Sequence, residues 1–105
     1  MSWFLLVLAG IFEVVWATSL KYTEGFTKFV PSFITLAAMF VSFYLLSLAL
    51  RSLPLGAGYA VWVGIGAVGT AILGVIAFHE PVTLLKVVSL TLVIVGIIGL
   101  KLSAG

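Results

Sequence analysis

The sequence contains no cysteine, which excludes disulfide bonds, thiolate nucleophiles and thiolate metal sites. It has a single histidine, His79, and its three acidic residues are far apart, so no group of side chains has the spacing of a metal site. No serine or threonine has a suitable base as a partner for nucleophilic catalysis. The sequence therefore predicts a protein that is not an enzyme and that needs neither a metal nor a cofactor.

Charged side chains are also scarce. They make up 8% of the 105 residues, whereas hydrophobic residues make up 64%, and the mean hydropathy is +1.41. Soluble proteins average about 25% charged residues, so this chain has too few to cover a water-exposed surface. Its five basic residues are scattered and do not form the basic patch that nucleic-acid binding requires. The composition predicts an integral membrane protein with no nucleic-acid partner.

Four apolar segments are long enough to cross a bilayer as helices, and short polar connections separate them. A helix rises about 1.5 Å per residue, so about 20 residues span a hydrocarbon core of roughly 30 Å. These segments use almost the whole chain. The predicted fold class is an all-α membrane protein, a single domain over residues 1–105 with four transmembrane helices at about residues 3–20, 29–50, 55–78 and 82–102.

Basic residues are distributed almost evenly between the two sides of the membrane. Four spans place Arg51, Lys101 and the amino terminus on one side, and Lys21, Lys28 and Lys86 on the other. An excess of lysine and arginine on one side normally sets the orientation, and two against three is no usable excess. Either another signal sets the topology, or the chain inserts in both orientations. The second alternative allows an antiparallel homodimer, which has the inverted-repeat architecture of larger transporters.

Glu13 lies in the middle of the first apolar segment. A charge at the bilayer centre costs at least about 2.5–3.5 kcal/mol on insertion scales, so by default it marks a functional site. On a helix, Gly10 and Trp16 share a face with Glu13, which leaves space beside the carboxylate and places an indole next to it. This face predicts a site for a cation. The alternative is a protonated, purely structural glutamate at a helix contact.

The third apolar segment combines glycines with aromatic residues. Residues 64–69 match the Gly-x-Gly-x-x-Gly dinucleotide pattern, but they lie inside a membrane-spanning segment with no strand before them. We therefore interpret these glycines as sites of close helix packing. Tyr59, Trp62 and Val63 share one face of this segment. Together with Ser42, the two aromatic residues can supply hydrogen-bond donors or flat ring faces to a carboxylate and a cation, although aromatic residues also serve for packing alone.

Several segments resemble the small multidrug resistance family, namely Gly10–Ala17, Leu20–Tyr22, Pro54–Gly56, Tyr59–Trp62 and the ending Gly96–Lys101. The likeness covers essentially the whole chain, and the Glu-Val-Val-Trp-Ala run is similar to the guanidinium-exporter branch. This resemblance implies a dual-topology antiparallel homodimer in the bacterial inner membrane that exchanges a guanidinium-class cation for protons. It implies that Glu13 binds both substrate and protons, and that the lining includes Gly10, Trp16, Ser42, Tyr59 and Trp62.

This chain departs from the pattern of that branch at three positions. It has Ala57, Gly58 and Val63, whereas the branch has threonine, alanine and threonine at these positions. The two lost hydroxyl groups predict a less polar pocket, and Val63 adds to its lining because it shares a face with Tyr59. We expect such a pocket to accept small substituted guanidinium compounds besides guanidinium.

Guanidinium keeps its charge across the membrane, because even the arginine side chain has a pKa of about 12.5–13.8. Release of the substrate must then come from protonation of Glu13, which burial and a second like-charged carboxylate would favour. Protons and substrate would compete for the same site. Three other interpretations remain open: a quaternary-ammonium or multidrug exporter of the same family, a small dual-topology ion channel, and a small helper subunit of a larger membrane complex.

Overall fold

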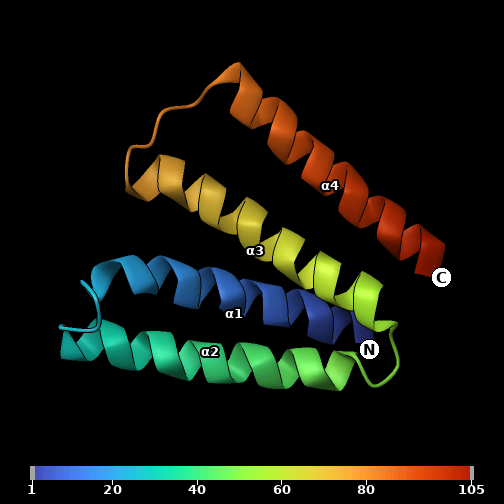
Figure 1. Cartoon of the computed structure of the whole chain (residues 1–105), viewed down its shortest axis with the longest axis horizontal. Coiled ribbons are helices and arrows are strands. Elements are labelled where there is room, and N and C mark those ends of the chain that lie inside the picture. The colour runs from blue at the N-terminus through green and yellow to red at the C-terminus, as the bar shows by residue number, and fades with distance from the viewer. Residues whose placement is uncertain (1, 105) are drawn as a thin grey trace.

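The computed structural model describes residues 2–104, which form four α-helices joined by short loops (Figure 1). The helices are α1 (Ser2–Tyr22), α2 (Phe29–Ala49), α3 (Leu55–Ala77) and α4 (Leu84–Ala104). Each is long and apolar enough to cross a membrane. The predicted all-α class with four membrane-spanning helices is therefore confirmed.

The start of α4 differs from its predicted position, because the helix begins at Leu84 rather than at residue 82. Thr83 precedes the helix, and its Oγ1 accepts a hydrogen bond from the backbone N–H of Lys86 at 3.1 Å. A threonine that satisfies an N–H group of the first turn is a favoured N-cap. The cap fixes the start of α4 and leaves Pro81 and Val82 in the loop.

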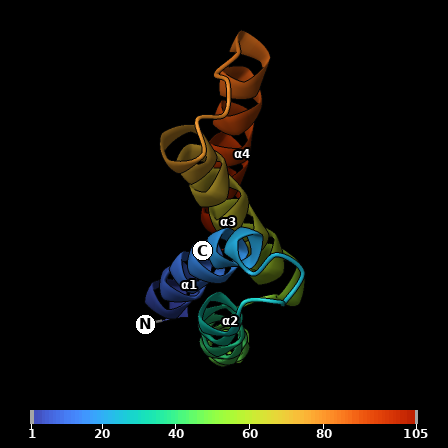
Figure 2. The ribbon, with the colours of Figure 1, turned by 90° about the vertical axis from the view of Figure 1, so that its left-hand side faces the viewer.

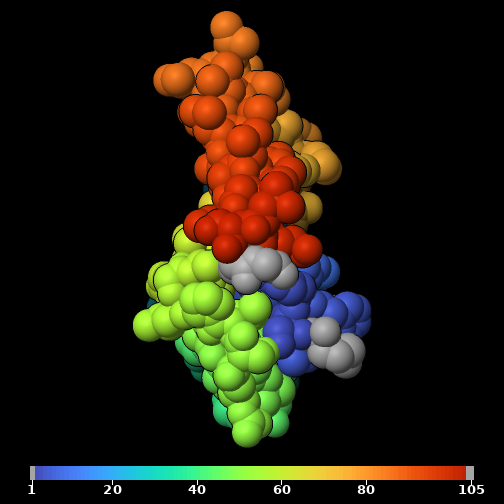
Figure 3. All heavy atoms as spheres, turned by 90° about the vertical axis from the view of Figure 1, so that its right-hand side faces the viewer, coloured from blue at the N-terminus to red at the C-terminus, as the bar shows by residue number. Residues whose placement is uncertain are grey.

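α1 lies between α2 and α3, and α4 packs on the far side of α3 (Figures 1 and 2). The buried core is small and comes from the first three helices: Leu6, Ala9, Leu46, Ala49, Val61 and Trp62. None of the residues Leu84–Ser103 of α4 is fully buried. Seen from the end that carries both termini, α4 protrudes beyond the body formed by α1 to α3 (Figure 3). Its face is therefore available to lipid or to another protein.

Charged side chains lie near the ends of the four helices, and Glu13 is the one exception. The end that carries the α1–α2 and α3–α4 loops contains two ion pairs, Lys28–Glu24 at 3.4 Å and Lys86–Glu80 at 3.5 Å. The first pair is solvent-exposed and the second is partly exposed, so each adds little to stability. Within residues 2–104, Glu13 is the one acidic residue inside a helix.

The loop between α1 and α2 follows a left-handed path. Glu24, Gly25 and Phe26 have φ angles of 48°, 74° and 65°, although only the glycine is expected to adopt this conformation from its residue type. Thr23 is almost fully buried and holds the loop: its Oγ1 donates to the Leu20 carbonyl at 2.7 Å and accepts from the Phe26 N–H at 3.2 Å. These hydrogen bonds offset the cost of the unusual backbone.

Candidate functional site

The Glu13 side chain extends from the middle of α1 to the backbone of α3. Its carboxyl group lies against Gly66, and a Cβ atom at position 66 would overlap it. The same helix crossing brings Gly69 against Val14 and places Ile65 over Gly10. Glycines let two membrane helices approach closely, so this part of α3 packs as the sequence predicts. Gly66 thereby provides the space that the carboxyl group occupies.

Glu13 and Trp16 each bury a polar atom that has no hydrogen-bond partner among residues 2–104. These atoms are Oε1 of Glu13 and Nε1 of Trp16. Leaving a buried donor or acceptor unsatisfied costs about 1–3 kcal/mol, and more for a charged group. The two residues are three apart on α1 and so lie on the same face. Such buried groups call for an explanation, and a ligand bound on this face is one that both atoms would share. A third atom of this kind, Oγ of Ser32, lies on α2.

Ser42 connects three helices one turn away from Glu13. Its Oγ donates to the Ala9 carbonyl at 2.7 Å and accepts from Nε1 of Trp62 at 3.1 Å. Both side chains are buried, with Ser42 fully covered. The structure thus brings together two of the residues that the sequence assigned to one site. The network also sets the spacing of α1, α2 and α3 beside the carboxylate.

Aromatic rings extend this network toward Trp16. The ring centroids of Tyr59 and Trp62 are 5.5 Å apart, and Phe43 lies 5.7 Å from Trp62 and 6.1 Å from Trp16 in edge-to-face geometry. Such contacts add to the stability of a packed aromatic group. Phe43 is not predicted from the sequence, because one phenylalanine in an apolar helix carries no distinguishing signal; its position directly after Ser42 is the only indication.

The predicted site residues differ in their solvent exposure. Gly10, Ser42 and Trp62 are buried, and Glu13 and Trp16 are half-buried. On α3, Tyr59 is 51% exposed and Val63 is 40% exposed. The candidate site is therefore a polar and aromatic face that the single chain leaves partly open. Residues 2–104 contain no cluster of side chains that could hold a metal ion.

Gly58, one of the three unusual residues of α3, has a packing explanation. A Cβ atom at this position would lie 2.5 Å from Cδ2 of Leu50, at the end of α2. Glycine therefore leaves room for the Leu50 side chain beside the first turn of α3. Of the other two unusual residues, Val63 is exposed on the open face, so it is the one more available to a ligand.

Substitution Ser42→Ala is expected to lower the free energy of unfolding by about 1–3 kcal/mol, because it leaves the indole N–H of Trp62 buried without a partner. Equilibrium unfolding in mixed detergent micelles would measure the change. Ser47→Ala is the matched control, since Ser47 is an exposed residue of the same helix that bonds only the Tyr44 carbonyl. Equal effects of the two substitutions would contradict the structural role of Ser42.

Comparison with known proteins finds one family and many relatives. The family model described as "Small Multidrug Resistance protein" matches residues 1–93. A protein of Proteus vulgaris named guanidinium exporter is 54% identical over 104 residues, which cover 99% of this chain and 100% of the relative. Proteins of the same name from Yersinia pestis and Salmonella typhimurium are 55% identical over 104 residues and 57% identical over 103 residues. They cover 99% and 98% of this chain, and 100% and 98% of their own lengths.

Proposed function

The chain belongs to the small multidrug resistance family, and we propose that it is a proton-coupled antiporter that exports guanidinium and small substituted guanidinium compounds. It is a multi-pass protein of the bacterial inner membrane, and a transporter rather than an enzyme. The names of its relatives support guanidinium as the substrate class. The exchange with protons and the role of each residue are our inference from the site.

The proposal depends chiefly on one observation: Glu13 is a half-buried carboxylate inside a membrane-spanning helix, with one oxygen unpaired among residues 2–104. A carboxylate and a planar guanidinium group form two parallel hydrogen bonds, which are short and charge-assisted. The indole of Trp16 on the same face offers a flat surface on which such a cation can stack. These two groups suit a small planar cation with N–H donors.

Protonation of Glu13 would release the substrate, because the neutral acid no longer attracts the cation. Guanidinium itself does not lose its charge at physiological pH, so the change must occur on the protein. A proton from one side and a cation from the other would then occupy the carboxylate in turn. Competition for one group is sufficient to couple the two fluxes, without any direct contact between them.

A second, inverted copy of the chain would complete the site. The molecule is only 17 Å thick along its shortest axis, and the candidate face remains open at Tyr59 and Val63. On α4, Gly96 and Gly99 have open space in front of their Cα atoms, which would allow close helix contact. The even distribution of basic residues is compatible with insertion in both orientations. In an antiparallel dimer the two Glu13 carboxyl groups would titrate as one coupled pair.

Transport by the purified protein in liposomes tests this function. An outward proton gradient should drive accumulation of guanidinium against its own gradient, and singly substituted guanidinium compounds should compete for it. A channel would only dissipate the guanidinium gradient. Equal transport of tetra-substituted ammonium ions would instead favour the multidrug interpretation, which we do not expect because Trp16 occupies space beside Glu13.

The substrate range should narrow when hydroxyl groups are restored to α3. In the double variant Ala57→Thr/Val63→Thr, we expect alkyl-substituted guanidinium compounds to be transported less well, while guanidinium is retained. A pocket with more hydrogen-bonding groups rejects a ligand that leaves those groups unpaired. The measurement is the ratio of the two transport rates in liposomes. If the ratio is unchanged in the double variant, these positions do not set the substrate range.

A further inference from the structure

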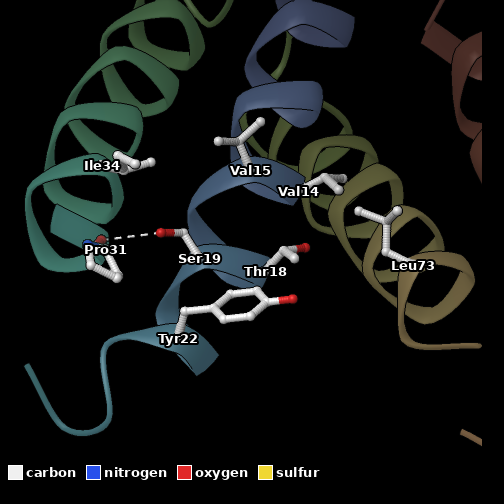
Figure 4. Close-up of a pocket in the computed structure, with 8 residues that line it drawn as sticks. All are labelled: Val14, Val15, Thr18, Ser19, Tyr22, Pro31, Ile34 and Leu73. Atoms are coloured by element: carbon white, nitrogen blue, oxygen red, sulfur yellow. Dashed lines mark hydrogen bonds between the residues drawn. The ribbon is translucent and has the colours of Figure 1, made fainter. Parts of the chain in front are cut away.

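An apolar hollow of about 410 Å³ lies over the C-terminal half of α1, between the start of α2 and the end of α3 (Figure 4). Its walls are aliphatic apart from the Tyr22 ring and hydroxyl groups near one end, where the Ser19 Oγ donates to the Pro31 carbonyl at 3.1 Å. The residues that line it are Val14, Val15, Thr18, Ser19, Tyr22, Pro31, Ile34 and Leu73.

A second hollow of about 280 Å³ continues the first along α1 and α2. It is lined by Phe12, Val15, Phe33, Ile34, Ala37, Ala38 and Val41, and it contains no polar lining residue. The two hollows share Val15 and Ile34. The two hollows therefore adjoin each other along α1 and α2, and we call them together the α1–α2 furrow.

The length of the α1–α2 furrow matches one leaflet of a bilayer. On α1 it extends from Phe12 to Tyr22, and on α2 from Pro31 to Val41. Ten residue steps at about 1.5 Å each give roughly 15 Å, which is half of a hydrocarbon core of about 30 Å. The furrow thus begins near one membrane border and ends near mid-depth, as a lipid tail does.

Two lysines lie at the border end of the furrow, together with Glu24, which pairs with one of them. Lys21 lies seven residues after Val14 and so continues the α3-facing wall, with its Nζ 4.4 Å from the ring centroid of Phe78. Lys28 immediately precedes α2, three residues before Pro31, and its side chain remains 60% exposed despite the ion pair with Glu24. Both ammonium groups retain N–H donors for an anion at the membrane border.

The furrow lies on the face of α1 opposite to the candidate site. Val15 and Tyr22 are two and nine residues after Glu13, which on a helix places both about half a turn away from the carboxylate. A cationic substrate has no carboxylate to bind here. A second copy that shares the Glu13 face, as in the dimer proposed above, would also lie on the other side of α1.

We propose that the α1–α2 furrow binds one acyl chain of a phospholipid with an anionic headgroup, whose phosphate contacts Lys21 and Lys28. The apolar walls match the chain, the length matches one leaflet, and the charge at the border end matches the phosphate. Each lysine near an anionic lipid surface contributes roughly a fivefold increase in affinity. The site does not depend on transport, so its failure would leave the role of Glu13 untouched.

Native mass spectrometry of the purified protein would test this site with phosphatidylglycerol and phosphatidylcholine of identical acyl chains. We expect preferential retention of phosphatidylglycerol, and a loss of affinity of at least about tenfold in the variant Lys21→Gln/Lys28→Gln. Binding of phosphatidylcholine should fall much less in that variant, because its choline ammonium offsets the charge of its phosphate. Arg51→Gln/Lys101→Gln removes the same charge at the opposite membrane border and should leave phosphatidylglycerol binding intact.

The furrow itself is tested by Ala37→Phe, which places a ring on an exposed position of its wall and should weaken binding of both lipids. Ser47→Phe adds the same ring to an exposed position of α2 outside the furrow and should have no effect. The proposal is overturned if Lys21→Gln/Lys28→Gln and Arg51→Gln/Lys101→Gln weaken phosphatidylglycerol binding equally. It is also overturned if Lys21→Gln/Lys28→Gln or Ala37→Phe binds lipid as the parent does.

Discussion

Glu13→Gln is expected to abolish proton-coupled export and to weaken guanidinium binding by at least about 100-fold. Removing one partner of a buried charge pair costs roughly 3–5 kcal/mol, because the other charge is left uncompensated. Glutamine has nearly the same shape as glutamate but neither a negative charge nor a titratable proton. Export from liposomes and equilibrium binding to the detergent-solubilised protein would measure the two effects separately.

The controls for this prediction come from the other acidic residues and from a conservative change. Glu24→Gln and Glu80→Gln alter residues that lie outside the helices, and both variants should transport normally. Glu13→Asp retains an acid on a shorter side chain, so it should remain active with an altered pH profile. Coupled transport by a folded Glu13→Gln variant would falsify the proposed mechanism.

Forcing all copies into one orientation is expected to abolish export almost completely. Ser52→Lys/Ser103→Lys adds two positive charges to the end that carries Arg51 and Lys101, so the positive-inside rule should retain that end in the cytoplasm. Arg51→Gln/Lys101→Gln removes charge from the same end and should favour the inverted orientation. Each variant alone lacks the inverted partner that the proposed antiparallel dimer requires.

Co-expression of these two oppositely biased variants should restore export, because it supplies both orientations in one membrane. The location of a C-terminal tag gives the orientation directly. For the parent chain, we expect the tag on both sides of the membrane in comparable amounts. A tag found on one side only, or full activity of one biased variant alone, would rule out the antiparallel dimer.

The sequence was sufficient to predict the helices and the central acid, because both depend on the energetics of the bilayer. A carboxylate in an apolar segment is so costly that Glu13 could be singled out without any knowledge of its surroundings. Apolar length likewise predicted four membrane-spanning helices. The observed helix ends lie within two residues of the predicted ones, and at the start of α4 the Thr83 cap accounts for the difference from Val82.

Features that depend on contacts between helices were only partly predictable. The glycines of α3 indicated close packing, but not that Gly66 receives the Glu13 carboxyl group. Phe43 joins Trp16 to Trp62 only because the crossing of α1, α2 and α3 brings three rings together. Periodicity placed Tyr59 and Trp62 on one face, yet the structure buries Trp62 and exposes Tyr59, because Ser42 of α2 accepts the Trp62 N–H.

The exposure of α4 has a consequence for how activity scales with the amount of protein in a cell. Lipid tails are as apolar as leucine side chains, so an unpaired α4 in a bilayer is not penalised as it would be in water. In the proposed dimer, pairing would therefore come from close packing, interhelical hydrogen bonds and mass action, and the paired fraction would rise with the mole fraction of protein in the membrane. At low expression the export rate should increase more steeply than the copy number, approaching its square, and become linear once nearly all copies are paired.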